Sequence, residues 1–149
     1  MTRLSQFLQN RVLAATMVAW ISAQTIKVLT AIRHQRRFDF RWFLGTGGMP
    51  SAHSAGVAAL ATGVGLQMGF HTATFATATM FALVTMFDAQ GVRRAAGRQA
   101  RVLNKIVDEV YEKGQVSEER LKELLGHTPI EVFAGGALGC LIAMLLCRF

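Results

Sequence analysis

The segment at residues 47–53 combines residue types that bind phosphate. It reads Gly-Gly-Met-Pro-Ser-Ala-His; glycine permits unusual backbone angles, and proline favours the first turn of a helix. The backbone N–H groups that begin a helix attract phosphate, so Ser51 and His53 are candidate phosphate-site residues. The alternative is a simple loop followed by a helix that Ser51 caps. A nucleotide-binding P-loop is excluded because no Gly-Lys-Ser/Thr sequence follows the glycines.

A second histidine lies in residues 126–131, which read Gly-His-Thr-Pro-Ile-Glu. His127 is a candidate nucleophile or base, and Glu131, about one helical turn later, would hold its ring nitrogen and fix the tautomer. Thr128 and Glu131 also have the Thr-x-x-Glu spacing of a capping box, with proline as the first helical residue. The sequence leaves both interpretations of Glu131 open.

Several cations complete the candidate site. Lys27 interrupts an apolar segment, where it either reaches toward lipid headgroups or neutralises a substrate phosphate. Arg93 and Arg94 either anchor the end of a membrane span or offer forked donors to phosphoryl oxygens. Asp88 would pair with one of these arginines or bind a metal ion, but no second aspartate follows at the short spacing of a magnesium site.

The distribution of charge predicts a membrane protein. The chain has 149 residues, a net charge of +7 and 52% hydrophobic residues, yet residues 42–87 contain no Asp, Glu, Lys or Arg. A soluble domain carries about 25% charged residues throughout. A soluble four-helix bundle is the alternative, but its helices would show charged outer faces.

Four apolar segments approach the length of about 20 residues that a membrane helix needs. We expect one domain, residues 1–149, folded as an all-α integral membrane bundle. Frequent glycine and alanine in the second and fourth segments would permit close helix packing. The expected spans are residues 12–32, 54–68, 72–87 and 130–147, and the short turn at residues 69–71 predicts an antiparallel hairpin of the second and third spans.

The polar connections predict the orientation. The loop after the first span is basic, and an insert at residues 88–126 starts basic and becomes acidic, with amphipathic helices expected at about 94–112 and 117–125. Loops rich in Lys and Arg tend to stay cytoplasmic, so we expect a site facing the cytoplasm in a bacterial cytoplasmic membrane. Nucleic-acid binding is not expected, because the basic stretches flank membrane spans without interleaved aromatic residues.

Three motifs, in order, are similar to a known family. They are residues 47–55 (Gly-Gly-Met-Pro-Ser-Ala-His-Ser-Ala), 88–100 (Asp-Ala-Gln-Gly-Val-Arg-Arg-Ala-Ala-Gly-Arg-Gln-Ala) and 125–132 (Leu-Gly-His-Thr-Pro-Ile-Glu-Val). Together they resemble the divergent, small membrane branch of the type 2 phosphatidic acid phosphatase and vanadium haloperoxidase superfamily. The likeness covers about residues 10–146. It implies hydrolysis of a phosphomonoester through a phosphohistidine, with no metal and no cofactor.

The resemblance also implies residue roles. His127 matches the nucleophile, and Glu131 stands where the family usually has the orienting aspartate. His53 matches the general acid on the leaving group, Ser51 the phosphate-contacting serine, and Lys27 the lysine of the first motif.

Two positions depart from the superfamily pattern. Where the first motif has Arg-Pro, this chain has His34, with no proline after it. Where the third motif has Ser-Arg shortly before the nucleophile, residues 120–121 are Arg-Leu. We expect Arg93 or Arg94 to supply the missing guanidinium. Further candidates for the site are Arg33, Asp88 and Arg120.

These features predict a membrane lipid phosphatase whose substrate is a phospholipid phosphate. A cytoplasm-facing site favours phosphatidylglycerophosphate, and four spans instead of the usual six favour a homodimer that completes the bundle. One alternative is a non-catalytic membrane subunit that binds anionic lipid or a partner protein through its basic loops. A phosphotransferase would need a metal-binding pair of aspartates that the sequence lacks.

Overall fold

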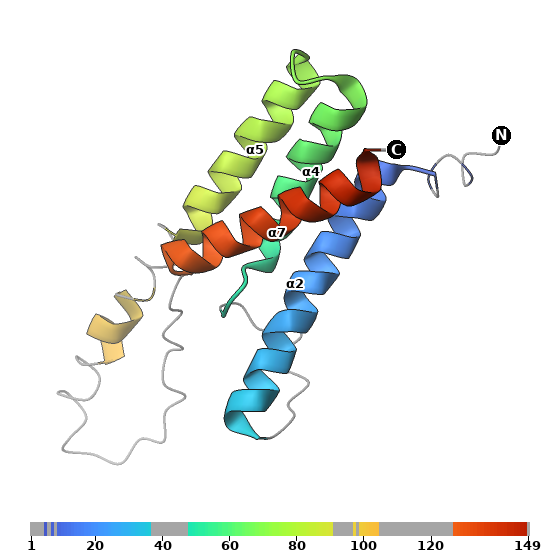
Figure 1. Ribbon diagram of the computed structural model, residues 1–149. Coiled ribbons are helices and arrows are strands. Elements are labelled where there is room, and N and C mark those ends of the chain that lie inside the picture. The colour runs from blue at the N-terminus through green and yellow to red at the C-terminus, as the bar shows by residue number, and fades with distance from the viewer. Residues whose placement is uncertain are drawn as a thin grey trace, which may run out of the picture.

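The computed structural model describes residues 5, 7, 9–36, 48–90, 97, 99–104 and 127–148. Regular structure in these residues is entirely helical, which confirms the expected all-α fold. The four long helices, shown in Figure 1, are α2 (Arg11–Gln35), α4 (Ala52–Met68), α5 (Ala73–Gln90) and α7 (Pro129–Cys147). Residues 97 and 99–104 are helical, within the first amphipathic helix expected in the insert. The second expected amphipathic helix, residues 117–125, lies outside the described residues.

Polar caps set the starts of the helices. The Asn10 side chain accepts a hydrogen bond from the Leu13 N–H at 3.0 Å and begins α2. The Thr72 hydroxyl accepts from the Phe75 N–H at 3.2 Å and begins α5. Each cap satisfies a backbone donor that the helix itself leaves without a partner. Caps therefore explain why long apolar stretches begin their helices at defined residues.

Helices α4 and α5 form the expected antiparallel hairpin (Figure 1). Gly69 turns the chain with φ = 97°, a conformation that residues with a β-carbon rarely adopt. Helix α5 then continues to Gln90, so that Asp88 belongs to its last turn and not to the insert.

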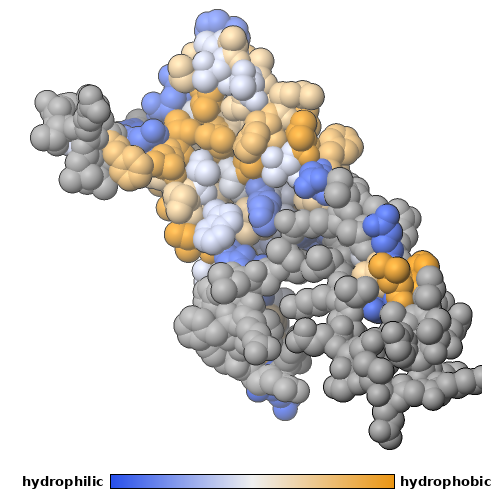
Figure 2. All heavy atoms as spheres, turned by 180° about the vertical axis from the view of Figure 1, so that it is seen from behind, coloured by the Kyte–Doolittle hydropathy of each residue, from blue (hydrophilic) through white to orange (hydrophobic). Residues whose placement is uncertain are grey.

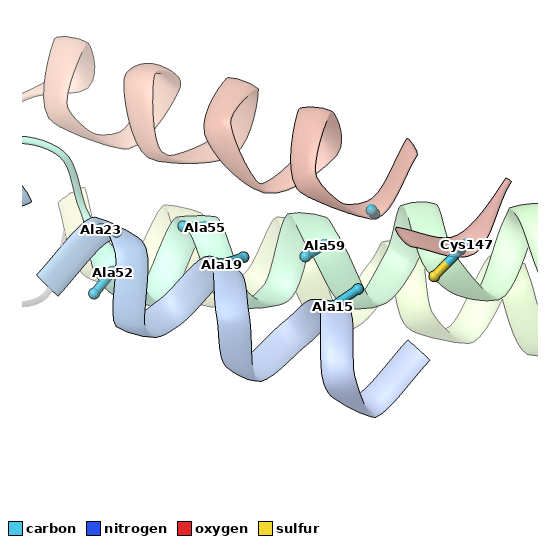
Figure 3. Close-up of a cluster of buried hydrophobic side chains, with 8 residues drawn as sticks. Ala15, Ala19, Ala23, Ala52, Ala55, Ala59 and Cys147 are labelled. Atoms are coloured by element: carbon cyan, nitrogen blue, oxygen red, sulfur yellow. The ribbon is translucent and has the colours of Figure 1, made fainter. Parts of the chain in front are cut away.

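Helix α4 occupies the centre of the bundle and packs against α2, α5 and α7. The core between α2, α4 and α7 consists almost entirely of alanine (Figure 3). Small side chains let helices approach closely, which favours association where lipid supplies no hydrophobic drive. The core members are Ala15, Ala19, Ala23, Ala52, Ala55, Ala59, Ala143 and Cys147.

Two glycines bring the backbones of α4 and α7 into contact. A β-carbon at Gly135 would overlap the carbonyl oxygen of Ser51, and one at Gly139 would overlap the carbonyl oxygen of Ala55. These glycines are four residues apart and so lie on one face of α7. The close packing expected from the glycine content is confirmed at this interface.

Large apolar side chains lie on the outside of the bundle. Phe87 is 72% exposed, Phe133 71% and Ile130 69%, and Figure 2 shows apolar atoms spread over the helical part of the face it displays. Small residues inside and large apolar residues outside suit a bundle surrounded by lipid. Helix α7 and residues Arg11–Arg33 of α2 are long and apolar enough to cross a membrane, whereas the apolar helix Ala73–Ala89 is shorter.

Candidate active site

Three segments that are distant in the sequence meet where α4 and α7 begin. The Ser51 N–H, just before α4, donates to the Glu131 carbonyl oxygen in α7 at 3.0 Å. The His127 N–H donates to the carbonyl oxygen of Ala89, near the end of α5, at 3.2 Å. These backbone hydrogen bonds hold the two histidine-containing motifs at the same end of the bundle.

The two histidine rings lie side by side, edge to face, within this junction. The His53 and His127 ring centroids are 6.4 Å apart, and the ring planes meet at 77°. His127 is 3% exposed, whereas His53, in the first turn of α4, is exposed. A buried imidazole therefore stands beside one that can reach solvent.

Lys27 reaches the same junction from α2. A β-carbon at Gly48 would lie 3.1 Å from both the Cγ and the Cδ atoms of Lys27, so the aliphatic part of this side chain passes directly beside Gly48. Lys27 also follows Ala23 by four residues, and therefore continues the row of α2 side chains directed at the core. Its half-buried side chain brings a positive charge into the region before Ser51.

Ser51 is the N-cap of α4. It is completely buried, and its hydroxyl oxygen accepts hydrogen bonds from the N–H and the hydroxyl of Ser54, at 3.4 and 3.1 Å. The capping role expected from the sequence is thus confirmed. The Met49–Pro50 peptide bond before it is cis.

Glu131 closes a capping box at the start of α7. Its carboxylate accepts from the Thr128 N–H at 2.8 Å, and its own N–H donates to the Thr128 hydroxyl oxygen at 3.4 Å. The structural interpretation of Glu131 is therefore confirmed. The carboxylate holds the backbone of the residue that follows His127, so it fixes the direction in which the chain leaves that histidine.

The remaining candidates lie farther out or outside the described residues. Asp88 is exposed and directly precedes Ala89, which accepts the His127 N–H. Arg33 is exposed near the end of α2. Arg93, Arg94 and Arg120 lie outside the described residues. Within the part of the chain that the structure describes, no three His, Cys, Asp or Glu side chains form a metal-binding group.

Two residues that shape the site were not among those predicted from the sequence. Ser54 is completely buried against Ser51, and Gly135 leaves room for the Ser51 carbonyl. The spacing of three residues between the serines was a signal for Ser54, because residues three apart share one face of a helix. The glycine content of α7 indicated close packing, but the contact of Gly135 with Ser51 depends on how two distant helices meet.

Comparison with known proteins identifies the family. Residues 8–142 match the family described as "Divergent PAP2 family". The chain belongs to the divergent PAP2 family. The chain is also similar to a protein of Bacillus subtilis (strain 168) that is named "Uncharacterized membrane protein YuiD". The two are 45% identical over an alignment of 155 residues, which covers 97% of this chain and 98% of the relative. No solved structure matches this divergent PAP2 protein.

Membership agrees with the resemblance seen in the three motifs. The match takes in α2, α4, α5 and most of α7, and with them Lys27, Ser51, His53, His127 and Glu131. This protein is thus a membrane protein of the divergent PAP2 family, and its family indicates a phosphatase-related function.

Proposed function

We propose that this protein is a membrane lipid phosphatase that hydrolyses a lipid phosphomonoester through a phosphohistidine at His127. The pairing of His53 and His127, with ring centroids 6.4 Å apart at the joined starts of α4 and α7, is the observation that carries the proposal. Two imidazoles at this separation can serve one phosphoryl group, one as nucleophile and the other as acid. Family membership supports the same chemistry.

The proposed reaction has two steps. A ring nitrogen of His127 attacks phosphorus, the ester P–O bond breaks, and His53 donates a proton to the leaving lipid oxygen. His53 then accepts a proton from water, which attacks phosphorus, breaks the P–N bond and releases inorganic phosphate. Burial of His127 keeps bulk water away from the nucleophile in the first step.

Fixed positive charge stabilises the transferring phosphoryl group in this proposal. Lys27 supplies it from α2, and Arg93 or Arg94 replaces the guanidinium that the third motif lacks. Ser51 donates a hydrogen bond through its hydroxyl, while Arg33, Asp88 and Arg120 act at the edge of the site. Positioned charges of this kind provide most of the rate in phosphoryl transfer, and we propose that the enzyme uses no metal or cofactor.

The proposed substrate follows from orientation. Loops rich in Lys and Arg tend to stay cytoplasmic, which supports a site on the cytoplasmic side of a bacterial membrane. The lipid that we propose for such a site is phosphatidylglycerophosphate. We propose four spans, with α4 and α5 crossing beside α2 and α7, and a homodimer that completes the bundle.

Release of inorganic phosphate by the protein in detergent tests this function. The wild type is offered a panel of lipid phosphomonoesters, alongside His127→Gln and His53→Gln. We expect His127→Gln to lower kcat at least about 1,000-fold and His53→Gln to lower it about 100-fold or more. His71→Gln is the matched control, because His71 is exposed in the turn between α4 and α5.

Two added compounds sharpen the test. Orthovanadate, which resembles the transition state of phosphoryl transfer, is expected to inhibit the enzyme, and a metal chelator is expected to leave its activity unchanged. The proposal is wrong if no lipid phosphate is hydrolysed, or if His127→Gln retains wild-type activity.

A non-catalytic membrane subunit is the second candidate. The capping roles of Ser51 and Glu131 favour it, because they give both residues a structural purpose that needs no reaction. It predicts that neither histidine variant alters binding to vesicles of anionic lipid, whereas replacing Arg93 and Arg94 together by glutamine weakens that binding.

A further inference from the structure

Ser54 is a buried hydroxyl whose contacts converge on one atom. It lies three residues after Ser51 in the first turn of α4 and is completely buried. Its N–H and its hydroxyl both donate to the Ser51 hydroxyl oxygen, at 3.4 and 3.1 Å. The Ser51 hydroxyl oxygen therefore accepts hydrogen bonds from both the N–H and the hydroxyl of Ser54.

These two hydrogen bonds change what the Ser51 hydroxyl can do. A serine hydroxyl has two acceptor lone pairs and one proton to donate. Because Ser54 occupies both lone pairs, the Ser51 hydroxyl can act toward a ligand only as a donor. It is also a poor nucleophile in this state, which leaves attack on phosphorus to His127.

The backbone of Ser51 is fixed as firmly as its side chain. Its N–H donates to the Glu131 carbonyl oxygen at 3.0 Å, and its carbonyl oxygen accepts from the Ala55 N–H at 3.0 Å. The same carbonyl oxygen lies against Gly135, where a β-carbon would overlap it. Among the described residues, the N–H, the carbonyl oxygen and the hydroxyl oxygen of Ser51 all have hydrogen-bond partners. The hydroxyl proton is the group that is left to bind a ligand.

We propose that Ser54 is a positioning residue that makes Ser51 a donor-only group, so that the site accepts an unprotonated phosphoryl oxygen. The inference rests on the proposed function, because it assigns Ser51 to the phosphate of the same substrate. A phosphoryl oxygen without a proton is an acceptor only, and a donor fixed in advance binds it without first reorienting. A ligand group that must donate a hydrogen bond at this position would find no acceptor on Ser51.

A double-mutant cycle tests the proposal. Ser51→Ala, Ser54→Ala and the double variant are compared with the wild type for two quantities: kcat/KM on a lipid phosphomonoester, and affinity for inorganic phosphate measured by phosphate-dependent thermal stabilisation. Thr62→Val is the matched control, since it removes a hydroxyl from the same helix, where Thr62 donates to Cys140 Sγ at 3.3 Å in α7. Ser51→Gly replaces Ser51→Ala if the latter does not fold, because N-cap positions tolerate glycine.

We expect Ser54→Ala to weaken phosphate binding and lower kcat/KM by about three- to tenfold, the effect of one oriented hydrogen bond. In the Ser51→Ala background the same change should have no further effect, because Ser54 acts through Ser51. Thr62→Val should leave both quantities unchanged.

Two outcomes would overturn the inference. One is a loss in Ser54→Ala that persists in full without the Ser51 hydroxyl, and the other is a Ser54→Ala variant that is less stable but binds phosphate normally. If the wild type binds phosphate, and the cycle shows the expected coupling without turnover of any lipid phosphate, the proposed function fails while the role of Ser54 stands. A wild type that neither binds phosphate nor hydrolyses a lipid phosphate contradicts both.

Discussion

The two arms of the α4–α5 hairpin are both apolar and similar in length, yet they have opposite positions in the bundle. Helix α4 is buried along most of its length and touches the three other long helices. Helix α5 exposes Phe81, Leu83, Val84 and Phe87. The buried arm is rich in alanine and glycine, and the exposed arm carries large side chains. Side-chain size, and not polarity, therefore distinguishes inside from outside here.

This difference also explains where the candidate site lies. Small residues let α4 approach α2 and α7 closely enough for backbone groups to touch. That approach brings His53, Lys27 and His127 to one end of the bundle. Helix α5 contributes to the site mainly through the carbonyl oxygen of Ala89 at its end.

The largest effect should come from breaking the close approach of α7 to α4. Gly139→Ala places a methyl group against the Ala55 carbonyl oxygen, and the two backbones must separate. We expect a loss of about 3 kcal/mol in the free energy of unfolding, measured by thermal or denaturant unfolding in detergent.

Gly136→Ala is the control for that prediction. Its β-carbon would meet only the terminal methyl group of Met86, at 3.2 Å, and a flexible methionine can move. A loss of stability as large as that of Gly139→Ala would show that helix flexibility, and not backbone contact, explains both results.

Removing the cap from each arm compares the starts of α4 and α5. Ser51→Ala and Thr72→Ala each remove a hydroxyl that accepts from a backbone N–H three residues later. We expect each change to cost about 1 kcal/mol of stability. Only Ser51→Ala should also lower phosphate release, because only α4 begins at the candidate site. Equal activity in the two variants would remove Ser51 from the site.

The capping box of α7 separates the two interpretations of Glu131. Glutamine can replace glutamate in a capping box, so Glu131→Gln should change stability by less than about 0.5 kcal/mol, whereas Glu131→Ala should cost about 1 kcal/mol. If the carboxylate also orients His127, Glu131→Gln lowers phosphate release about tenfold or more despite normal stability. Wild-type activity in Glu131→Gln would leave Glu131 with the capping role alone.

The smallest effect is expected on the outer surface of α5. Phe81 is 56% exposed, and Phe81→Ala should change stability in detergent by less than about 0.5 kcal/mol. Ala59→Leu, at a completely buried position of α4, should cost about 1–3 kcal/mol because the core has no space for a larger side chain. A large loss in Phe81→Ala would indicate that this surface is covered, as in the proposed homodimer.

Much of the fold followed from local sequence signals. Serine and threonine before apolar segments predicted the caps of α4 and α7, and Thr128 with Glu131 predicted the capping box. The short turn before α5 predicted the hairpin. Such signals are reliable because a cap or a turn involves only neighbouring residues.

The site was only partly predictable, because its geometry depends on contacts between residues that are distant in the sequence. The sequence singled out His53 and His127, but the 6.4 Å between their rings results from hydrogen bonds of Ser51 to Glu131 and of His127 to Ala89. The sequence leaves the role of Glu131 open, because a capping glutamate and an orienting glutamate occupy the same position. The contact between Ser54 and Ser51 has a helical spacing, yet the proposed donor-only role of Ser51 depends on the two hydrogen bonds that Ser54 donates to its hydroxyl oxygen.

The sequence by itself determined that this chain is apolar and helical, that its charges gather outside residues 42–87, and that its polar motifs begin helices. Only the tertiary structure decided that α4 is central, that α5 is peripheral, and that the two histidines meet. The physical reason is that lipid and protein interior are both apolar, so no alternation of polar and apolar residues marks which face of a helix is buried. Packing of small residues against neighbouring backbones makes that choice, and it depends on helices far apart in the chain.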